Sequence, residues 1–271
     1  MHTLRNRILF FGPTAVLGGL SLVLHRYMME NYLDAKGLLI PGNLPGRLLW
    51  ILGVGFAVYL IVMLRSSGGE GTYADNFPRC MLSGSMMIGA GLALLMAVPE
   101  LGLVSEVEPV PLTPMAAVVG RVIDLASAYL PYGAAAAMVI LGAFRFLGKR
   151  PHYLVSGVVC LFYMLVLVSY YRRWSADPQL QDYAYQLLAL VLLMLCSFHR
   201  VCCDAEIIQR KRLLFTGLCA AFCCMAALSV PFQRGLYLAS GLWAAGSMCN
   251  VAVLPPDPEE DEEEQPEPEA P

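Results

Sequence analysis

Eight apolar runs, each about 20 residues long, decide what this chain can fold into. They cover approximately Ile8–Met28, Leu44–Leu64, Cys80–Val98, Tyr129–Leu147, Tyr153–Tyr171, Tyr183–Val201, Leu213–Val230 and Leu236–Leu254. An α-helix needs about 20 mainly apolar residues to cross the hydrocarbon core of a bilayer. The runs hold no Asp, Glu or Lys, and their few Arg residues lie near the ends, where a long side chain reaches the interface. We therefore predict an all-α, polytopic transmembrane helix bundle of about eight spans, with seven as the alternative, over residues 1–254.

The stretch Met115–Ala128 is apolar too, yet it holds Arg121 and Asp124. A charge near the centre of a bilayer costs roughly 2.5–3.5 kcal/mol. This cost predicts that 115–128 forms a short interfacial helix and that the next span begins at Tyr129. Arg121 and Asp124, three residues apart, would pair on the polar face of that helix.

Charge is scarce and unevenly distributed. Only 14% of the residues are charged, against roughly 25% in soluble domains. Nine of the 21 acidic residues lie between Asp257 and Glu269, so removing them from the net charge of −3 leaves the body at +6. The acidic, Pro/Glu-rich segment 255–271 cannot bury a core and is predicted to be a disordered tail, either solvated or docked on a basic protein partner. A mildly basic body suits a lipid bilayer with anionic lipids, and no clustered basic face indicates nucleic acid.

The first run is predicted to stay as a helix, because it ends in His25-Arg26-Tyr27 and not in the small residues of a signal-peptide cleavage site. With eight spans, the side of the N-terminus collects 11 basic residues and the other side seven. Basic residues near span ends favour the cytoplasm. This bias predicts that both termini, and so the tail, lie in the cytoplasm.

The segment between the fifth and sixth runs is the richest candidate for a binding site. It contains Arg172, Arg173, Trp174, Asp177, Asp182 and Tyr183. These residues are predicted to form the rim of an outward-facing cavity. The alternative is an interfacial turn held by local ion pairs, in which Asp177 caps the next helix ahead of Pro178.

Two short patterns resemble a group of bacterial multi-pass membrane proteins. One is Trp174-Ser-x-Asp-Pro-x-Leu-x-Asp-Tyr183 and the other is Asp34-Ala-Lys-Gly37-Leu38. The resemblance covers about a tenth of the chain. It implies a multi-pass protein of the bacterial cytoplasmic membrane and no particular activity.

Six of the nine cysteines lie close together in the sequence: Cys196, Cys202, Cys203, Cys219, Cys223 and Cys224. Cys196 and Cys219 are each about two turns from the connecting loop and could face each other. No C-x-x-C motif or zinc-type ligand spacing is present, so we interpret these thiols as small buried residues. Neither a metal nor another cofactor is predicted. The polar stretch from His199 to Glu206 is interpreted as a solvated loop.

Small residues four apart predict close helix packing. Such pairs are Ser85 and Gly89, Gly133 and Ala137, and Ser240 and Ala244. Packing within one bundle is the first interpretation and a dimer contact is the alternative, so the oligomeric state stays open.

Three functions remain. One is a small-molecule transporter or the membrane subunit of one, and another is a non-catalytic sensor, scaffold or assembly module. The third, an intramembrane enzyme, is disfavoured because no catalytic residues are indicated and His2, His25, His152 and His199 are scattered.

Overall fold

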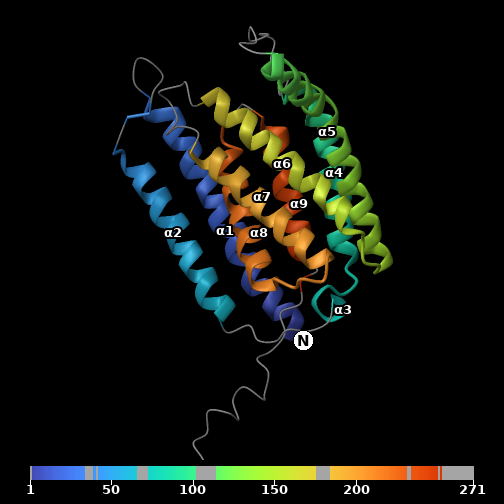
Figure 1. Ribbon diagram of the computed structural model, residues 1–271. Helices are drawn as coiled ribbons and strands as arrows, with labels where there is room; N and C mark the ends of the chain where they lie inside the picture. Colours follow the sequence, from blue (N-terminus) through green and yellow to red (C-terminus); the bar gives the residue numbers. More distant parts are fainter. Residues whose placement is uncertain are drawn as a thin grey trace, which may run out of the picture.

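The computed structural model describes residues 2–33, 39–40, 42–65, 73–101, 114–174, 184–230, 233–249 and 251. Its long helices are α1 (His2–Asn31), α2 (Leu44–Arg65), α4 (Met81–Ala97), α5 (Pro114–Leu147), α6 (Tyr153–Trp174), α7 (Ala184–Asp204), α8 (Arg210–Ala227) and α9 (Arg234–Cys249). A single helical turn, α3 (Tyr73–Asn76), precedes α4, and a 3₁₀ turn, η1 (Val98–Glu100), follows it. Consecutive long helices run in alternating directions along one bundle (Figure 1).

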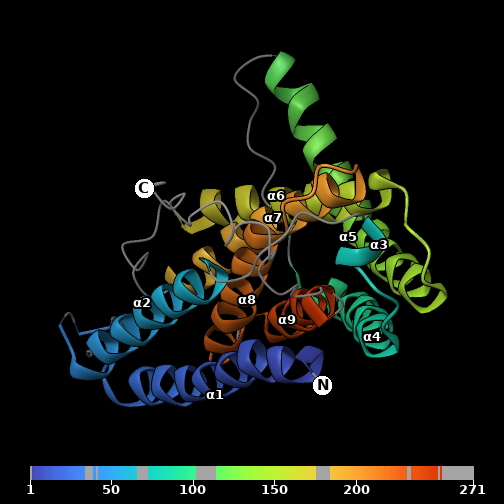
Figure 2. The ribbon, with the colours of Figure 1, turned by 90° about the horizontal axis from the view of Figure 1, so that it is seen from below.

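Two helices, α8 and α9, form the centre of the bundle (Figure 2). In α8, 14 of 18 residues are buried, whereas in α2 only five of 22 are. The outer helix α2 is also the most apolar, with a mean hydropathy of 2.2. In lipid, the surface that faces the acyl chains must be apolar, while helices covered by protein can carry small and polar residues. The burial pattern is therefore that of a bundle built for a membrane.

Six of the described helices are long and apolar enough to cross a bilayer: α1, α2, α4 with η1, α5, α6 and α7. The eight spans expected from the sequence are thus not confirmed in number. The two that fall short are α8 and α9, of which α9 has only 16 residues. Both are rich in small residues, mainly Ala and Cys in α8 and Ala, Gly and Ser in α9, as expected for helices that other helices shield from lipid.

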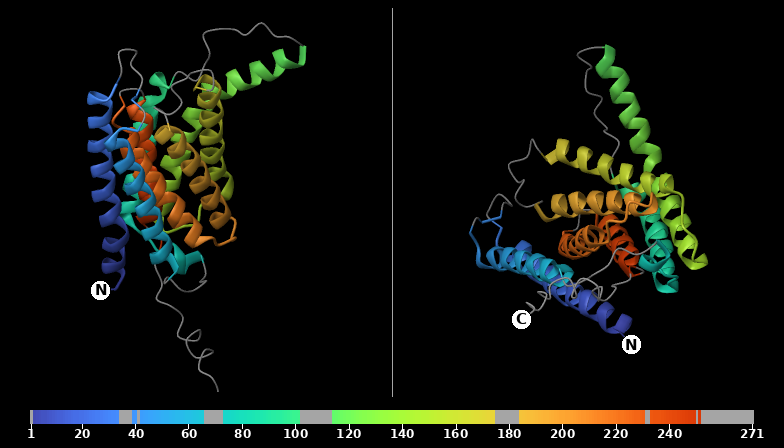
Figure 3. Two further views of the ribbon diagram at one scale, coloured as in Figure 1. Left: turned by 90° about the vertical axis from the view of Figure 1, so that its left-hand side faces the viewer. Right: turned by 60° about the horizontal axis from the view of Figure 1, so that its bottom comes forward.

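The segment predicted to be a separate interfacial helix is continuous with the span that follows. One helix, α5, runs for 34 residues and contains Pro131, while its apolar part begins at Leu125. Its first half turns away from the bundle (Figure 3) and exposes Arg121. Pro131 lacks the N–H that would bond one turn back, which loosens the helix where the two halves meet. The Asp124 side chain lies outside the described residues, so its pairing with Arg121 stays a prediction.

The tightest helix contact in the bundle joins α4 to α5 through glycines. A Cβ added at Gly84 would lie 2.9 Å from the carbonyl oxygen of Gly142, and one at Gly91 would lie 2.6 Å from that of Ala135. Small-residue packing is therefore present, but at a seven-residue spacing. No heavy atom of the described residues lies within 4 Å of a Cβ added at Gly89, so the interpretation of packing within one bundle was wrong for this residue, and the dimer alternative stays a prediction.

Candidate functional site: a buried aspartate beneath a basic pocket

The candidate site lies at the end of the bundle where α1 begins and α5 and α7 finish (Figure 1). Both finishing helices close with a backbone turn in which one residue adopts a left-handed conformation. In α5 this residue is Gly148, at φ 66°, and in α7 it is Glu206, at φ 70°. The turns carry Lys149 and Arg150 from one helix, and Glu206 from the other, to the same side of the bundle.

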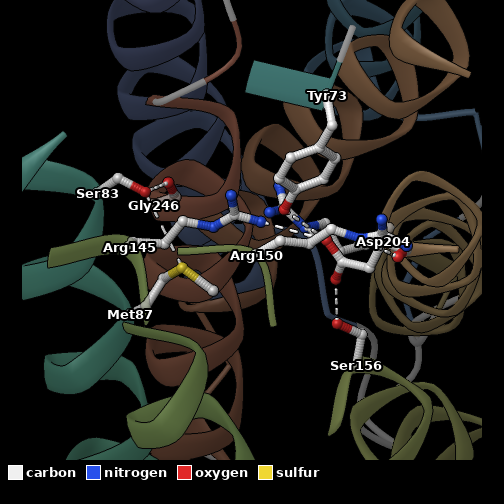
Figure 4. Close-up of polar contacts among 9 residues, drawn as sticks. Tyr73, Ser83, Met87, Arg145, Arg150, Ser156, Asp204 and Gly246 are labelled. Carbon is white, nitrogen blue, oxygen red and sulfur yellow. Dashed lines mark hydrogen bonds and ion pairs between the residues drawn. The ribbon is translucent and has the colours of Figure 1, made fainter. Parts of the chain in front are cut away.

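The carboxylate of Asp204 is the centre of the site (Figure 4). It is fully buried, although it ends a helix. Its Oδ1 accepts a hydrogen bond of 2.9 Å from the Tyr73 hydroxyl and lies 3.3 Å from Nη2 of Arg145. Its Oδ2 accepts a hydrogen bond from the hydroxyl of Ser156. The Nε of Arg200, one turn earlier on α7, lies 3.4 Å from Oδ1.

The guanidinium groups also stack on aromatic rings. Arg145 lies over the rings of Tyr73 and Phe77, at 5.7 and 5.4 Å from their centroids, and Arg200 lies 4.6 Å from that of Phe77. Arg150 covers Tyr73 at 5.6 Å and donates from Nε to the backbone oxygen of Asp204 at 2.8 Å. Such stacking helps to stabilise cations that are withdrawn from water.

A cavity of about 480 Å³ opens above this cluster. Its charged lining consists of Arg79, Arg145, Lys149, Arg150 and Glu206. The aromatic rings of Tyr73 and Phe77 form part of its wall. The pocket thus combines four cations with one carboxylate, and that carboxylate, Glu206, is paired with Arg150.

The charges at this end do not balance within the described part of the chain. Beneath the pocket, Arg145, Arg200 and Arg210 are each less than 5% exposed, against one equally buried carboxylate, Asp204. Arg210 donates from Nη1 to Oδ1 of Asn76 at 3.3 Å, which is a neutral partner. None of the three guanidinium nitrogens of Arg200 makes a hydrogen bond with a described residue. Three buried guanidinium groups therefore lie at one end of the bundle beneath a basic pocket, and guanidinium groups are the usual protein partners of carboxylate and phosphate groups.

Tyr73, on the short helix α3, serves as a neutral donor. Burial raises the pKa of its phenol above the ordinary value of 10, and the nearby positive charge of Arg200 opposes this only in part. The hydroxyl therefore stays protonated at physiological pH and donates a hydrogen bond to Asp204.

The stretch His199–Glu206, interpreted from the sequence as a solvated loop, is largely a helix end packed inside the protein. Arg200 and Asp204 are fully buried, and the helix extends through Asp204. That interpretation was wrong because burial here comes from partners on α3, α5 and α6, which the local sequence does not contain. The spacing of four residues between Arg200 and Asp204 was the available signal, since it sets two opposite charges on one helix face.

The predicted rim residues Arg172, Arg173, Trp174, Asp177, Asp182 and Tyr183 lie outside the described side chains, although α6 includes positions 172–174. The rim and the capping role of Asp177 stay predictions. The same holds for the tail 255–271.

All nine cysteines are free thiols, and Cys196, Cys203, Cys219, Cys223 and Cys224 are buried among the helices of the core. No group of three or more His, Cys, Asp or Glu residues in the described ranges is arranged to hold a metal ion.

Comparison with protein-family models, curated proteins and solved structures finds no match to this chain. Its apolar helices identify it as a multi-pass membrane protein, and its function has to be argued from the geometry of its sites.

Proposed function

We propose that this protein, in the bacterial cytoplasmic membrane, recognises an anionic ligand, bearing a phosphate or carboxylate group, in the basic pocket above Asp204. The observation that carries the proposal is the charge of the site. Four basic side chains line the pocket, namely Arg79, Arg145, Lys149 and Arg150, and one carboxylate, Glu206, lines it with them; Arg200, Arg210 and Asp204 are buried beneath it.

The roles of these residues follow from their burial. Arg145 reaches both Asp204 and the pocket, so it links the buried cluster to the ligand. Asp204 holds Arg145 in position and is itself held by hydrogen bonds from Tyr73 and Ser156. Arg79 and Lys149, which are exposed, would meet the ligand first. Guanidinium groups held in this way bind phosphate and carboxylate through two parallel hydrogen bonds.

The same end of the bundle carries Arg65, Lys211 and Arg212 in addition to the pocket residues. This excess of basic residues supports an orientation with the pocket in the cytoplasm. We further propose that α8 and α9 lie at membrane depth inside the ring of outer helices, which gives eight crossings in all. A cytoplasmic basic pocket between helices can receive a lipid headgroup or a soluble anion, since both present the same phosphate chemistry.

Recognition, as in a sensor or an assembly module, suits the bundle better than an open conduit. The interior between the two ends is filled by large side chains such as Trp243, Tyr163 and Tyr237, each at most 1% exposed. Transport is the second candidate. It is favoured by the polar atoms buried in that interior, because the Tyr163 and Tyr237 hydroxyls and Trp243 Nε1 have no hydrogen-bond partner among described residues.

The test is anion binding by the purified, full-length protein in a neutral detergent. Inorganic phosphate and pyrophosphate should raise the melting temperature, and Lys149→Gln or Arg79→Gln should weaken binding by about tenfold, since a hydrogen bond to a charged group contributes roughly 1.5–3 kcal/mol. Lys211→Gln is the matched control, because it removes one positive charge at the same end outside the pocket. An equal loss of anion affinity in all three variants would mean that binding depends only on the overall positive charge at this end of the bundle, and it would contradict the proposal.

Two further experiments test whether the natural ligand is a lipid headgroup or a soluble anion, and whether binding leads to transport. Phosphatidylglycerol added to the detergent-purified protein should compete with pyrophosphate if the natural occupant is a lipid. Reconstituted vesicles should show no flux of labelled phosphate if the protein is a recognition module. Flux that depends on Arg145 would favour the transporter.

A further inference from the structure

A second cavity, of about 410 Å³, lies at the opposite end of the bundle. It forms where α1, α2 and the start of α7 meet, and Leu39, Ile40 and Gly42 also line it. Its lining includes His25 from α1, Arg47 and Trp50 from α2, and Tyr185 from α7. None of these residues belongs to the basic pocket.

Two of the lining residues, His25 and Tyr185, each carry a buried polar atom without a hydrogen-bond partner in the described part of the chain. The His25 imidazole is 1% exposed, and its Nδ1 contacts the Ser229 hydroxyl. Its other nitrogen, Nε2, has no hydrogen-bond partner, and neither has the hydroxyl of Tyr185, whose side chain is 6% exposed. Buried donors and acceptors are nearly always satisfied in folded proteins, so an unpartnered pair in a cavity wall indicates a place for a ligand.

The Ser229 contact orients the imidazole. Because Nδ1 is engaged, Nε2 is the ring nitrogen left to bond a ligand. The edge of the imidazole also meets the Tyr185 ring, with centroids 5.3 Å apart and planes at 69°. One aromatic contact and the contact with Ser229 thus hold His25 in place before any ligand enters.

The remaining walls are aromatic on one side and cationic at the mouth. The Trp50 and Tyr185 rings lie 5.6 Å apart, tilted by 39°, and about half of Trp50 is exposed. Arg47 is three residues before Trp50 on α2, so both lie on the same face of the helix, and Arg47 is exposed. Asn43 also lines the cavity, but its side chain is used locally, since Oδ1 accepts from the N–H of Gly46 at 2.6 Å.

We propose that this cavity binds a small planar organic acid. The apolar ring of the ligand packs against Trp50 and Tyr185, a polar group bonds Nε2 of His25, and the carboxylate pairs with Arg47 at the mouth. A largely apolar pocket with a few fixed polar groups is the usual form of a small-molecule site. Aromatic side chains suit a planar body, and a guanidinium suits a carboxylate.

The experiment uses the purified, full-length protein in neutral detergent, with benzoate and 2-naphthoate as probes in isothermal titration calorimetry. Both should bind, and 2-naphthoate should bind more tightly because it buries more ring. Arg47→Gln should weaken benzoate binding about tenfold, and Trp50→Leu should weaken 2-naphthoate binding more than benzoate binding. Both residues are exposed, so these variants should fold.

The matched control is Arg26→Gln, which removes an exposed arginine near the same end that pairs with Glu30 and does not line the cavity. It should leave both affinities unchanged. Benzyl alcohol, the neutral counterpart of benzoate, should bind at least tenfold more weakly.

Three outcomes would overturn the proposal. They are equal binding of benzyl alcohol and benzoate, no heat of binding at millimolar probe, and equal losses of affinity in Arg26→Gln and Arg47→Gln. Competition of phosphatidylglycerol with benzoate would replace it by a lipid site. Loss of benzoate binding with phosphate binding intact would separate this cavity from the basic pocket.

Discussion

Asp204 is the one fully buried carboxylate in the described part of the protein, and side chains from four helices approach it. Arg200 is its neighbour on α7. The other partners, Tyr73, Arg145 and Ser156, are 131, 59 and 48 residues away in the sequence. A carboxylate in such surroundings neutralises cations that burial has removed from water, and its contribution depends on all of its partners.

Replacement of Asp204 by Asn should therefore be strongly destabilising. The amide keeps the size and one acceptor oxygen but leaves Arg145 and Arg200 without a buried counter-charge, at a cost of about 3–5 kcal/mol. The readout is the melting temperature of the purified protein in detergent. The control is Glu206→Gln, which breaks an ion pair whose side chains are 37% and 70% exposed. That exposed pair should contribute no more than about 1 kcal/mol, so similar shifts in both variants would contradict the role given to Asp204.

Asp204 also shows how much of a buried site can be predicted from the sequence. The pair Arg200 and Asp204 could have been predicted, because opposite charges four apart on a helix face each other. Their burial could not, since the short helix α3 and the ends of α5 and α6 supply it. No local pattern relates Tyr73 or Ser156 to Asp204. His25 is a similar case, because its partner Ser229 lies 204 residues away.

At the scale of the elements, the length of an apolar run predicts where a long helix lies in the sequence, but not which other helices it packs against. The predicted runs coincide with α2, α4, α6 and α7 to within a few residues. The boundary of α5 was missed because the charges of Arg121 and Asp124 predicted a break before Tyr129, whereas one helix continues from Pro114 to Leu147. The central helices α8 and α9 were predicted as two further spans, and their place at the centre of the bundle is seen only in the assembled structure.

The contact between α4 and α5 gives a test at this scale. A Cβ at Gly142 would lie 2.7 Å from the backbone oxygen of Gly84 and equally close to Cγ1 of Ile88. Gly142→Ala should force the two helices apart and lower the stability by roughly 1–3 kcal/mol, seen as a lower melting temperature. The matched control is Gly89→Ala on α4, where nothing lies within 4 Å of the new methyl group. It should be neutral or slightly stabilising, because alanine favours a helix more than glycine does. A lower melting temperature for Gly89→Ala than for Gly142→Ala would refute this packing.

For the whole molecule, the alternating helices place the two cavities at opposite ends (Figure 1). The basic excess near the pocket above Asp204 predicts that this end faces the cytoplasm and that the His25 cavity faces outward. The sequence supports this through the distribution of Arg and Lys. It could not have predicted that each end carries a cavity, because both cavities form between helices that are distant in the chain.

Orientation can be tested by labelling single introduced cysteines in intact cells. Glu30→Cys, exposed at the end of α1, should react with a membrane-impermeant maleimide, and Lys149→Cys should react only after permeabilisation. Cys160 and Cys202, the two native thiols that are not fully buried, would be replaced by alanine to lower the background. The chain without an introduced cysteine gives the baseline. The reverse pattern would mean that the protein has the opposite orientation in the membrane. Labelling of both positions from outside would rule out the alternating arrangement.

The acidic tail provides the last test, because the described core is complete without it. The final described residue, Val251, is 4% exposed, belongs to the main hydrophobic cluster and donates its N–H to the oxygen of Met248. A chain that ends at Leu254 keeps this contact and removes all nine carboxylates of the tail. Its expression and melting temperature should match those of the full chain, because a segment of Pro, Glu and Asp has no apolar surface to bury.

The matched control is a chain that ends at Cys249. It loses the same tail together with Val251, and burying a valine side chain contributes about 1.5–3 kcal/mol. Its melting temperature should therefore fall, while that of the Leu254 chain should not. A large fall already at Leu254 would mean that the carboxylates dock on the basic end of the bundle, for example on Lys211 and Arg212. Addition of salt separates the two causes, since screening weakens docking of an acidic segment but leaves the packing of Val251 intact.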